Sequence, residues 1–494
     1  MKRRDFLSMT VGAAAMAGTR PVFATARQTG VIGANNRIRA AIIGCGGRGN
    51  AVARDWQLHK DTVFVAACDV DDMRTQNSAN TLAGRQEGAK VDAVADYRRI
   101  LERNDVDALL IGTPDHWHTP MVIEGMSAGK DIYCEKPVSN TVEAAVAMRD
   151  AARKSNRIVQ IGTQQRSWVH FMEAAQMFQD GYIGSVRYIQ MSPPGGGGGA
   201  VAPPDPSTFA SRQPAEPIPP GFNWEMYQGP APRKPYLTAR RGFRGWWDYG
   251  GGNLTDWGVH LVDVMAWLMK LDNQAPLLTS AVCQPQNSLR DPERTPSSYA
   301  VTWQYPNFIA TLGNVSLPGV EHPEENYGDW FFGQRGVLLL NRLGYDFKAS
   351  GGGRGGGGRG AAPGAAGAAA AGQAGPAGRA GAAAPAAGAG APAGGGGRGG
   401  GRGQAAGAPA GPAQAPMEPK RVWDLNGRSE AAGSKFADAT RDHVRNFLDS
   451  MRSRQPPRSP VEAGFAASLP CLLANVAIRE EKTVKWDGNK VILT

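Results

Sequence analysis

A lysine in this sequence stands where it could polarise a reacting oxygen. Lys136 lies within Glu135-Lys136-Pro137, directly after an apolar run that is typical of a β-strand. The proline fixes the backbone and keeps the lysine out of a helix. A lysine at the end of a strand can hydrogen-bond a hydroxyl and stabilise the negative charge that forms as its proton leaves. Taken alone, the tripeptide is also compatible with a solvated surface lysine.

A histidine with two carboxylates at helical spacing is the second candidate. Asp256, His260 and Asp263 follow a run of glycines at i, i+4 and i+7, and Thr255 directly precedes them. If Thr255 caps a helix, the three side chains share one face. A carboxylate one turn before a histidine can orient its ring and stabilise its charged form. His260 is therefore a candidate general base for an alcohol proton; a capped helix with a buried, hydrogen-bonded histidine is the alternative.

A glycine-rich loop supplies a candidate phosphate site. Gly44, Gly46 and Gly49 lie between an apolar, strand-like run at 37–43 and a helix-like segment at 51–58. Gly44 allows a tight turn, Gly46 lets the backbone approach a pyrophosphate, and Gly49 permits close packing of the helix. The helix N-terminus adds N–H groups and the positive end of its dipole. The expected structure is a dinucleotide site of the Rossmann type.

An acidic residue at the end of the next strand indicates which cofactor binds. Asp69 follows Gly49 by 20 residues and comes directly after the apolar run 62–68. A carboxylate there accepts hydrogen bonds from ribose hydroxyls and repels a 2′-phosphate. The pattern predicts NAD, whereas Arg48 could reach a phosphate and leaves NADP possible. An ordinary aspartate at a strand end is the alternative.

Two histidines follow another predicted strand. Residues 113–118 have the sequence Thr-Pro-Asp-His-Trp-His and come after the run 107–112, at the sheet edge where ligands bind in doubly wound folds. His116 and His118 suggest a metal site, but no cysteine or acidic residue stands at convincing metal spacing. We expect no metal, and a metal-dependent hydrolase is a remote option. Trp117 could pack on a cofactor or belong to the core.

The elements that position these residues alternate along the first third of the chain. Apolar runs typical of buried strands are separated by segments with helical patterning and short connections. This alternation predicts a parallel sheet with helices on both faces. The strands are expected at 37–43, 62–68, 107–112, 130–134 and 158–161, and the helices at 51–58, 96–103, 120–128 and 141–154.

The pattern changes after residue 162, where longer loops and proline clusters begin. The later apolar runs suit an antiparallel sheet. The predicted fold class is therefore α/β, with an N-terminal Rossmann parallel sheet and a C-terminal α+β domain that carries a mostly antiparallel sheet. The open sheet offers a face for packing, and we expect a homo-oligomer. The later runs lie at 186–191, 298–303, 308–315 and 336–340.

The positive charge lies mostly on two appended segments. The formal net charge is +10, of which residues 1–26 carry +3 and residues 351–416 carry +5, which leaves about +2 for the rest. The tract 351–416 consists of Gly, Ala, Pro, Gln and Arg, so it cannot build a core and is predicted to be a disordered insert in a surface loop. No nucleic-acid partner is expected. The five cysteines form no CxxC pair, which leaves a zinc ribbon or redox dithiol unsupported.

The N-terminus has the pattern of an export signal. Residues 1–26 contain an Arg-Arg pair followed by x-Phe-Leu, a short and weakly apolar stretch, and an Ala-x-Ala cleavage pattern. The arginine pair resembles the twin-arginine signal, and an ordinary secretory signal is the alternative. The twin-arginine route carries folded proteins, so a cofactor could be loaded before export. We expect a periplasmic protein with no stable membrane insertion after cleavage.

These motifs together resemble the Gfo/Idh/MocA family of sugar and polyol oxidoreductases. The most specific pieces are Glu-Lys-Pro at 135–137 and Gly-Gly-x-x-x-Asp-x-Gly-x-His-x-x-Asp at 251–263. The pieces that look like the exported, twin-arginine branch are Trp-His-Thr-Pro at 117–120, Gly-Thr-Gln-Gln-Arg-Ser at 162–167 and Trp-Trp-Asp-Tyr-Gly-Gly at 246–251. The resemblance divides the chain into a signal peptide at 1–26, an NAD(P)-binding domain at 36–162, a substrate and oligomerisation domain at 163–350 and 417–494, and the insert at 351–416.

The resemblance implies a role for each candidate. His260 would be the general base, Asp256 would orient it or bind a substrate hydroxyl, and Lys136 would polarise the reacting oxygen. Hydride would pass between the substrate carbon and nicotinamide C4. The candidate cofactor contacts, from the glycine motif and the resemblance together, are Gly44, Gly46, Gly47, Arg48, Gly49, Asp69, Thr113, Pro114, His116, Trp117, His118, Glu135 and Gln164.

The expected activity is hydride transfer between nicotinamide and a hydroxyl of a sugar, cyclitol or related polyol. One alternative is an NAD-retaining, glycosidase-like enzyme that oxidises, eliminates, hydrates and reduces, because an exported protein has little soluble NAD to draw on. Another is a non-catalytic, cofactor-stabilised binding protein, against which the set of Lys136, Asp256 and His260 argues. The insert and the proline- and glycine-rich stretch 193–206 depart from the family pattern, which leaves the substrate open.

Overall fold

The fold is described from a computed structural model of the 494-residue chain. The predicted signal peptide at 1–26 and the predicted insert at 351–416 lie outside the residues that the structure describes. The described residues are 37–86, 89–193, 209–272, 274–283, 291–314, 327–350, 420–421 and 436–494.

The first sheet consists of six parallel strands, β1 (Ile38–Ile43), β2 (Thr62–Cys68), β3 (Asp92–Val94), β4 (Ala108–Ile111), β5 (Asp131–Cys134) and β6 (Val159–Ile161). Their order is β3-β2-β1-β4-β5-β6. The central strands are short apolar runs, and β4 and β5 are wholly buried, as in a sheet covered on both faces. The strand order reverses between β1 and β4, which is where doubly wound sheets bind ligands.

The connecting helices are α1 (Gly47–Trp56), α2 (Asp72–Arg85), α3 (Tyr97–Leu101), α4 (Asp115–Ser127) and α5 (Val142–Arg153). Two of them begin earlier than the sequence predicts. The glycine loop itself forms the first turn of α1, with Gly46 at the N-cap, and α4 begins directly after Pro114. Residues 115–118 are therefore helical and not a loop. The sequence analysis also missed α2 and β3.

The second sheet contains the strands β7 (Val186–Ser192), β8 (Leu278–Cys283), β9 (Tyr299–Gln304), β10 (Ile309–Asn314), β11 (Gly328–Gly333), β12 (Gly336–Asn341), β13 (Gly344–Ala349), β14 (Lys420–Arg421), β15 (Val484–Trp486) and β16 (Val491–Leu493). Their order is β14-β13-β12-β11-β7-β10-β9-β8-β15-β16, and among these described pairs only β7 and β10 are parallel. The alternation of buried and exposed residues in β9 is that of a sheet with one covered face. The predicted fold class is confirmed.

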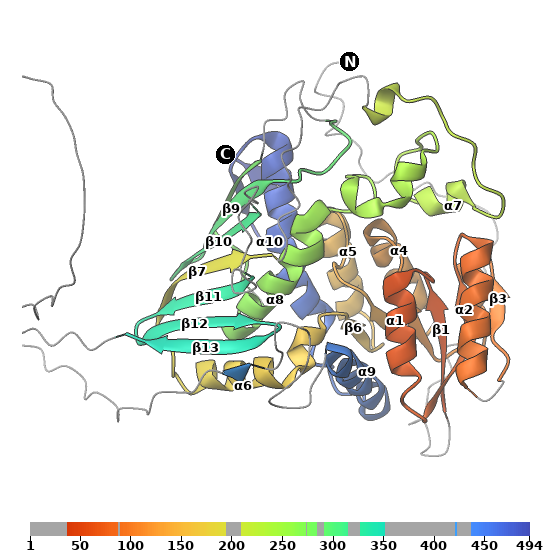
Figure 1. The fold of residues 1–494 in the computed structure, drawn as a ribbon, viewed down its shortest axis with the longest axis horizontal. Helices are drawn as coiled ribbons and strands as arrows, with labels where there is room; N and C mark the ends of the chain where they lie inside the picture. The colour runs from red at the N-terminus through yellow and green to blue at the C-terminus, as the bar shows by residue number, and fades with distance from the viewer. Residues whose placement is uncertain are drawn as a thin grey trace, which may run out of the picture. The chain divides into compact units, whose positions relative to one another are not determined.

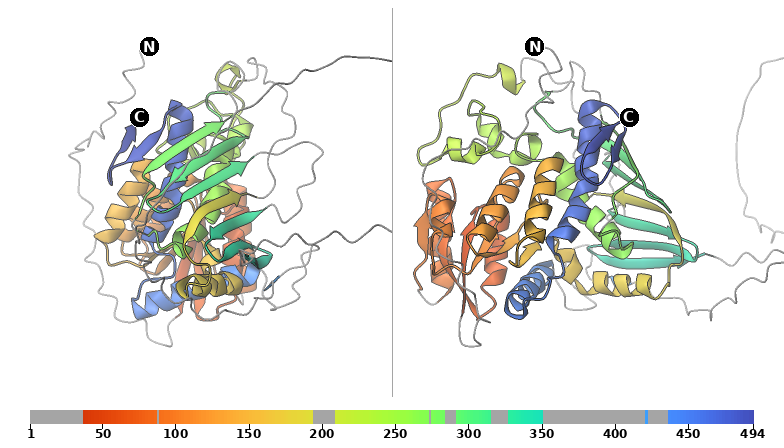
Figure 2. Two further views of the ribbon diagram at one scale, coloured as in Figure 1. Left: turned by 90° about the vertical axis from the view of Figure 1, so that its left-hand side faces the viewer. Right: turned by 180° about the vertical axis from the view of Figure 1, so that it is seen from behind.

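The second half of the chain contributes five described α-helices, two of which lie between the two sheets. These are α6 (Val169–Gln179), α7 (Trp224–Gln228), α8 (Val259–Leu268), α9 (Phe436–Ser453) and α10 (Val461–Glu480). Helices α8 and α10 lie between the first and second sheets, as Figures 1 and 2 show. Helix α9 returns to the first sheet and packs Phe447 against Trp56 of α1. The two sheets therefore share one continuous helical layer, which holds residues of both halves in fixed relation.

One described helix, α10, is long and apolar enough to cross a membrane by length and composition. The sequence analysis did not single it out. In the structure, 89% of its apolar stretch is buried inside the protein. Its apolar side chains are accounted for by the core that they form with α5, α8 and β6.

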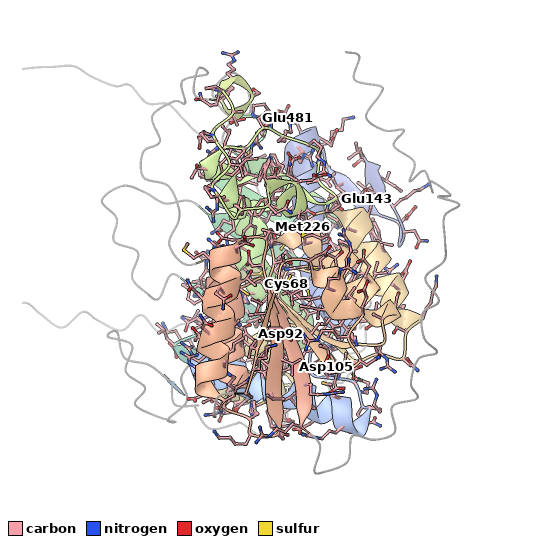
Figure 3. The ribbon with its side chains drawn as sticks, turned by 90° about the vertical axis from the view of Figure 1, so that its right-hand side faces the viewer. Cys68, Asp92, Asp105, Glu143, Met226 and Glu481 are labelled. Atoms are coloured by element: carbon pink, nitrogen blue, oxygen red, sulfur yellow. The ribbon has the colours of Figure 1, made fainter. Side chains whose placement is uncertain are left out.

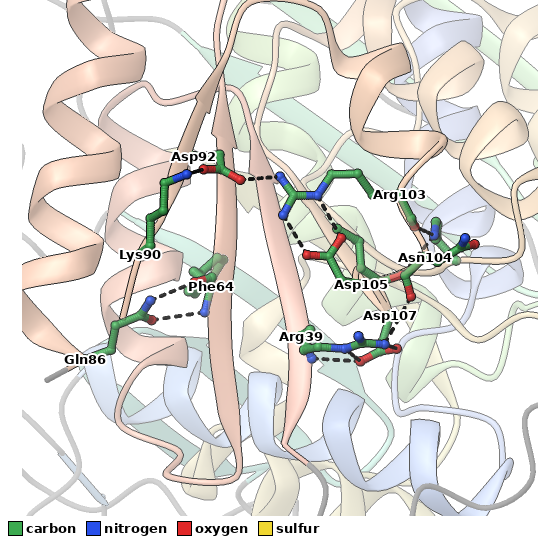
Figure 4. A network of polar contacts seen from close by, with 11 residues as sticks. Arg39, Phe64, Gln86, Lys90, Asp92, Arg103, Asn104, Asp105 and Asp107 are labelled. Carbon is green, nitrogen blue, oxygen red and sulfur yellow. Dashed lines mark hydrogen bonds and ion pairs between the residues drawn. The ribbon is translucent and has the colours of Figure 1, made fainter. Parts of the chain in front are cut away.

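The two edges of the first sheet differ in character. At the amino ends of the strands, ion pairs join neighbouring segments: Arg39 with Asp107 at 2.8 Å, and Arg103 with both Asp92 at 2.8 Å and Asp105 at 2.7 Å (Figure 4). The opposite, carboxyl edge faces residues of the second half, and Figure 3 shows Cys68 at the end of β2 towards Met226, with Asp92 and Asp105 at the far end. The first edge is braced by side chains, and the second is available for a site.

Candidate active site

A cavity of about 460 Å³ lies at the carboxyl ends of β1, β2, β4 and β5. Its walls come from the loops after these strands, from parts of residues 222–244, from residues 256–260 and from the turn between β12 and β13. The glycine loop and the candidate proton-transfer residues thus line one cavity. Of the residues predicted from the sequence, the lining includes Gly44, Gly46, Gly47, Arg48, Asp69, Thr113, Pro114, Trp117, Glu135, Lys136, Gln164, Asp256 and His260.

The glycine loop is shaped by two close approaches and one open space. Gly44 has a φ of +93°, and a Cβ there would lie 2.6 Å from the backbone of Gly112. A Cβ on Gly49 would lie 2.1 Å from the carbonyl oxygen of Gly44, so the helix can approach the strand only with glycine at this position. Nothing lies within 4 Å of a Cβ built on Gly46 or Gly47. The N-terminus of α1 therefore faces free space, as a phosphate cradle requires.

Asp69 both faces the cavity and supports the loop. Its Oδ2 accepts a hydrogen bond from the backbone N–H of Cys45 at 2.7 Å, and its Oδ1 accepts one from Asp71 at 3.1 Å. Burial raises the pKa of this carboxyl group, and the two hydrogen bonds oppose the effect. The residue thus ties the glycine loop to the end of β2, a contact that the sequence analysis did not foresee. Its predicted contact with ribose stays a prediction.

A covering segment, residues 209–249, closes one end of the cavity. Its backbone pairs with the start of α2: the amide of Asp72 donates to Gly221 and the amide of Asn223 donates to Val70, both at 2.8 Å. Arg241 of this segment forms an ion pair with Asp71 at 2.6 Å and lies over the Phe222 ring. The cavity wall beside Asp69 includes Phe222, Met226 and Arg241 from this segment.

These features fit a dinucleotide. The loop offers an uncapped helix N-terminus, and Asp69 ends the strand that should meet a ribose. At the other end of the cavity, the side-chain Oε1 of Gln164 is buried and has no hydrogen-bond partner among the described residues. An amide N–H of a bound nicotinamide would satisfy such an acceptor. Glu135 and Arg48, 2.8 Å apart, line the wall near this end.

Lys136 and Asp256 meet in the cavity from two different parts of the chain. The Lys136 ammonium donates to Asp256 Oδ1 at 2.6 Å and to the Asp256 carbonyl oxygen at 2.8 Å. Arg244 binds the other carboxylate oxygen at 2.8 Å. Burial acts to raise the pKa of Asp256, but the two cations outweigh it and hold the pKa below its ordinary value. Asp256 is thus a fixed negative charge that holds the Lys136 ammonium in place.

His260 lines the same cavity as a neutral ring. Its side chain is buried, and its Nδ1 has no hydrogen-bond partner among the described residues. Burial, together with the positive charges of Arg342, Lys136 and Arg48, holds the pKa of His260 well below its ordinary value. A neutral imidazole can accept a proton, as a general base must.

The predicted orientation of His260 by Asp256 is wrong. The segment Leu254–Gly258 is a π-helical turn before α8, and the helix already begins at Gly252, so Thr255 does not cap it. The wider turn breaks the i, i+4 relation, and Asp256 binds Lys136 and Arg244 instead. π-helical turns inside α-helices are frequent at functional sites.

Asp263 does not join the other two on one face. It is fully buried, and its Oδ1 binds Arg166 at 2.8 Å, in the core behind the cavity. Burial raises the pKa of Asp263 to about 6, against the effect of Arg166. The three residues therefore do not share the one face that their spacing predicted. Asp256 and His260 line the cavity, and Asp263 lies in the core.

The two histidines of the 113–118 motif point away from the cavity. His116 Nε2 lies 2.9 Å from the Tyr227 carbonyl oxygen, and His118 Nδ1 lies 2.6 Å from the Pro137 carbonyl oxygen. Burial lowers the pKa of both rings, that of His116 to about 4. Because the motif forms the first turn of α4, these rings hydrogen-bond to neighbouring backbone, and neither lines the cavity where we expect the cofactor. No cluster of metal-binding side chains occurs among the described residues.

Among the side chains of the cavity wall that were not predicted from the sequence, four lie near Lys136, Asp256 and His260. Asp115 was part of a quoted motif but received no role, and Trp257 lay inside the glycine-rich motif. Arg244 belongs to the covering segment and Arg342 to the turn between β12 and β13, where its guanidinium lies over the Trp257 ring. No local pattern marks the two arginines, because the tertiary fold alone brings them to Asp256 and His260.

Comparisons with known proteins agree with this architecture. Residues 38–163 match the model described as "Oxidoreductase family, NAD-binding Rossmann fold", and residues 209–305 match "Oxidoreductase family, C-terminal alpha/beta domain". A Glycosyl hydrolase family 109 protein of Saccharopolyspora erythraea is 33% identical over 159 residues, which cover 31% of this chain and 34% of that protein. An inositol 2-dehydrogenase of Klebsiella pneumoniae is 28% identical over 150 residues, with 30% and 43% covered. The matched part thus spans well under half the length of these relatives.

A solved structure resembles the chain over most of its length. The aldose-aldose oxidoreductase of Caulobacter crescentus, complexed with glycerol, has a TM-score of 0.53 at 17% identity and covers 91% of this chain and 100% of that one. At this identity the likeness concerns the fold, and both sheets are included. The Rossmann half and part of the second half of the chain are thus similar to the Gfo/Idh/MocA oxidoreductase family, and the solved structure shares the two-sheet fold.

Proposed function

We propose that this protein is an NAD(P)-dependent oxidoreductase that acts on a CH–OH group of a sugar, cyclitol or related polyol. The observation that carries the proposal is the ion pair of Lys136 with Asp256, which lies in one cavity with the glycine loop and the neutral ring of His260. A hydroxyl bound there meets one hydrogen-bond donor of fixed charge and one proton acceptor. Both are needed to oxidise an alcohol, since its proton and its hydride leave separately.

Each of the chain's own residues has a separate role in the proposed oxidation. Lys136 donates a hydrogen bond to the reacting oxygen and stabilises negative charge on it, while Asp256, itself bound by Arg244, holds the lysine in place. His260 accepts the hydroxyl proton, and its cationic neighbours favour early release of that proton. When bound, the nicotinamide ring supplies the hydride acceptor.

We infer NAD rather than NADP as the preferred cofactor. Asp69 ends β2 and lines the cavity, where a carboxylate favours free ribose hydroxyls over a 2′-phosphate. Arg74 and Arg241 line the same end, but both face Asp71, whose carboxylate lies 3.7 Å from Arg74 and 2.6 Å from Arg241. The Asp71 carboxylate thus offsets one of these two positive charges, and NADP remains the second choice.

A second candidate function is glycoside cleavage with a retained cofactor. Curated relatives that match about a third of the chain carry the name Glycosyl hydrolase family 109 protein. The covering segment encloses one end of the cavity through backbone pairing at Asp72 and Asn223, which supports slow release of a bound dinucleotide. Oxidation, elimination, hydration and reduction within one turnover would regenerate the cofactor. A non-catalytic binding protein is disfavoured by the complete set of Lys136, Asp256 and His260.

One experiment separates these readings. The purified protein is assayed with a panel of cyclitols, aldoses and glycosides, with and without added NAD, and reduced nicotinamide and released aglycone are both measured. Reduced nicotinamide with a polyol supports the main proposal, and aglycone release without added NAD supports the second. If neither product forms with any compound, and Lys136→Met and His260→Gln behave like the unaltered protein, the catalytic assignment is wrong.

We also propose export by the twin-arginine route to the periplasm. The support is the Arg-Arg-x-Phe-Leu pattern within residues 1–26. Replacing both arginines by lysine should leave the protein in the cytoplasmic fraction of the producing cell. Export that continues unchanged would contradict the proposal.

A homo-oligomer formed through the second sheet is our proposal for the assembly. Its support is the group of partly exposed apolar side chains on these strands, which includes Val282, Ile309 and Phe332. Light scattering after gel filtration would give the mass. A monomer at micromolar concentration would contradict it.

A further inference from the structure

A second carboxyl group lies in the cavity wall beside Lys136. Asp115 opens α4, lines the cavity and is only 5% exposed. The charges that act on it are Lys136, Asp256 and Arg244, which come from three other segments. One lysine is thus flanked by two carboxyl groups, of which the proposed reaction uses only Asp256.

The backbone around Asp115 makes room for this carboxyl group. It accepts a hydrogen bond from the backbone N–H of Gly251. A Cβ on Gly250 would lie 3.3 Å from Asp115 Oδ2, so the neighbouring chain passes close to the acid. The side chain is held in one place and faces the cavity that also holds Lys136. Such fixed placement is what a proton-transfer group needs.

The two carboxyl groups differ in protonation. Burial raises the pKa of Asp115 to about 7, with Asp256 adding to the rise and Lys136 and Arg244 opposing it. The pKa of Asp256 lies below its ordinary value, for the reasons given above. Near neutral pH, Asp256 is a fixed anion, whereas Asp115 exists in both forms. Two acids whose environments separate their pKa values are typical of a division into a permanent charge and an acid–base group.

We propose that Asp115 is a second proton-transfer group, which removes and returns a proton at the carbon adjacent to the oxidised carbon of the substrate. The inference rests on the proposed function, because the ketone is the product of that reaction. A carbonyl oxygen held by Lys136 withdraws electrons from the neighbouring C–H bond. Asp115 lines the same cavity as Lys136 and presents a carboxylate to the C–H bond next to the carbonyl.

The step is balanced and needs no further reactant. The C–H bond breaks and its proton goes to a carboxylate oxygen of Asp115. The electron pair forms a carbon–carbon double bond, and the carbonyl oxygen becomes an enolate oxygen that faces the Lys136 ammonium. Return of the proton restores the ketone. A group that does this gives the cavity the means for elimination next to the oxidised carbon, which simple dehydrogenation does not require.

The test bypasses hydride transfer by supplying the ketone directly. Inososes, the ketones of inositol, and keto-sugars are incubated in D₂O with the protein and NAD, and deuterium at the carbon next to the carbonyl is followed by NMR. The protein should accelerate exchange over buffer. Asp115→Asn keeps a hydrogen-bond acceptor for Gly251 but cannot take a proton, and should slow exchange by about 100-fold. Asp55→Asn, a change to a buried carboxyl group of raised pKa outside the cavity lining, should exchange at the unaltered rate.

The pH dependence of exchange in the unaltered protein is the second measurement. The groups near Asp115 are Lys136, Asp256, Arg244, Cys134 and Tyr227; burial raises the pKa of the Cys134 thiol and of the Tyr227 phenol above their ordinary values. Asp115 is therefore the group of this cluster that ionises near neutrality. Exchange should rise as pH passes through about 7, because the carboxylate is the active form. A profile that is flat through this range overturns the inference even if Asp115→Asn fails to fold.

The outcomes also distinguish this inference from the proposed function. Hydride transfer is measured in the same proteins with a C-deuterated polyol. Hydride transfer without enzyme-dependent exchange of any ketone overturns the role of Asp115 and leaves the oxidoreductase intact. Exchange without hydride transfer overturns the oxidoreductase. If Asp115→Asn slows exchange no more than hydride transfer, Asp115 is a positioning residue and not a proton-transfer group.

Discussion

Lys136 and Asp256 are 120 positions apart in the chain, and their side chains meet at 2.6 Å. The lysine follows the last residue of β5, and the aspartate lies in the π-helical turn before α8. This ion pair joins the parallel sheet to the second half of the fold within the cavity. The reactive lysine is therefore in place only when both halves are folded and packed.

Replacement of Lys136 by methionine should lower kcat by roughly 100- to 1,000-fold, the range seen when one stabilising donor is lost. Bound dinucleotide should be retained, because the glycine loop is untouched. Initial rates and nucleotide content are measured on the same sample. Lys154→Met, a change to an exposed lysine at the end of α5, is the matched control. Equal kcat values for the two variants would contradict the role of Lys136.

Two alanine substitutions in the glycine loop should have opposite effects on folding and binding. Gly49→Ala places a Cβ 2.1 Å from the Gly44 carbonyl oxygen and should destabilise the protein strongly. Gly46→Ala meets nothing within 4 Å, so the free energy of unfolding should hardly change. The added methyl group instead occupies the space above the N-terminus of α1, and NAD affinity should fall at least tenfold. Urea denaturation and calorimetric titration with NAD measure the two effects.

A Gly46→Ala protein that binds NAD as tightly as the unaltered chain would show that the pyrophosphate lies elsewhere. A stable Gly49→Ala protein would contradict the close approach of α1 to β1. Gly84→Ala, inside α2 and with no atom within 4 Å of its Cβ, serves as the control for the effect of alanine itself.

Arg241→Ala should speed the release of bound dinucleotide, because it removes the ion pair at 2.6 Å that fastens the covering segment to Asp71. We expect the dissociation rate to rise by up to about fivefold, since a partly exposed ion pair contributes up to about 1 kcal/mol. Stopped-flow displacement of a fluorescent NAD analogue gives the rate. Arg233→Ala removes an exposed pair with Glu225 on the same segment and should leave the rate unaltered. Equal rates for both variants would mean that this segment does not control release.

The buried histidines should make the free energy of unfolding depend on pH below about pH 6.5. Burial lowers the pKa of His443 to below its ordinary value of 6.5, so the unfolded chain binds a proton there that the folded chain does not. Unfolding is therefore favoured as pH falls, by about 1.4 kcal/mol per pH unit for one histidine. His443→Gln should reduce the slope of unfolding free energy against pH by this amount.

Raised pKa values of carboxyl groups such as Asp115 and Asp263 act in the opposite sense, because the folded chain holds those protons more tightly. The unaltered protein and His443→Gln both contain these carboxyl groups, so their effects cancel when the two slopes of unfolding free energy against pH are subtracted. Urea denaturation of both proteins at several pH values supplies the slopes. Parallel slopes would mean that His443 is protonated in the folded protein.

The fold could be predicted from the sequence because the patterns that indicate its strands and helices are local. Apolar runs that end in Gly44, Asp69 and Lys136 place these residues at strand ends, and a parallel sheet then brings the strand ends to one edge. The missed helix α2 has weak patterning, with only four buried residues in its 14. The start of α4 was misplaced because Pro114 suggests a loop, although proline is also favoured beside a helix N-terminus.

The candidate site could be predicted from the sequence only in part, for a different reason. Spacing alone suggested that Asp256 orients His260, but the π-helical turn alters the register, and no sequence rule reveals such a turn. Arg244 and Arg342 reach the cavity from the covering segment and from a hairpin turn, so their proximity to Asp256 is a result of tertiary packing. Asp115 was visible in its motif, but its burial was not, and burial is what gives it a pKa near neutrality.

The proposed oxidoreductase activity is tested most directly by following hydride from substrate to cofactor. The protein is incubated with fully C-deuterated myo-inositol or glucose, denatured at once, and the released dinucleotide is weighed by mass spectrometry. We expect reduced nicotinamide carrying one deuterium, in an amount that Lys136→Met and His260→Gln both lower sharply. A dinucleotide that stays free of deuterium with every C-deuterated polyol and sugar tested, or a protein that binds no dinucleotide, would contradict it.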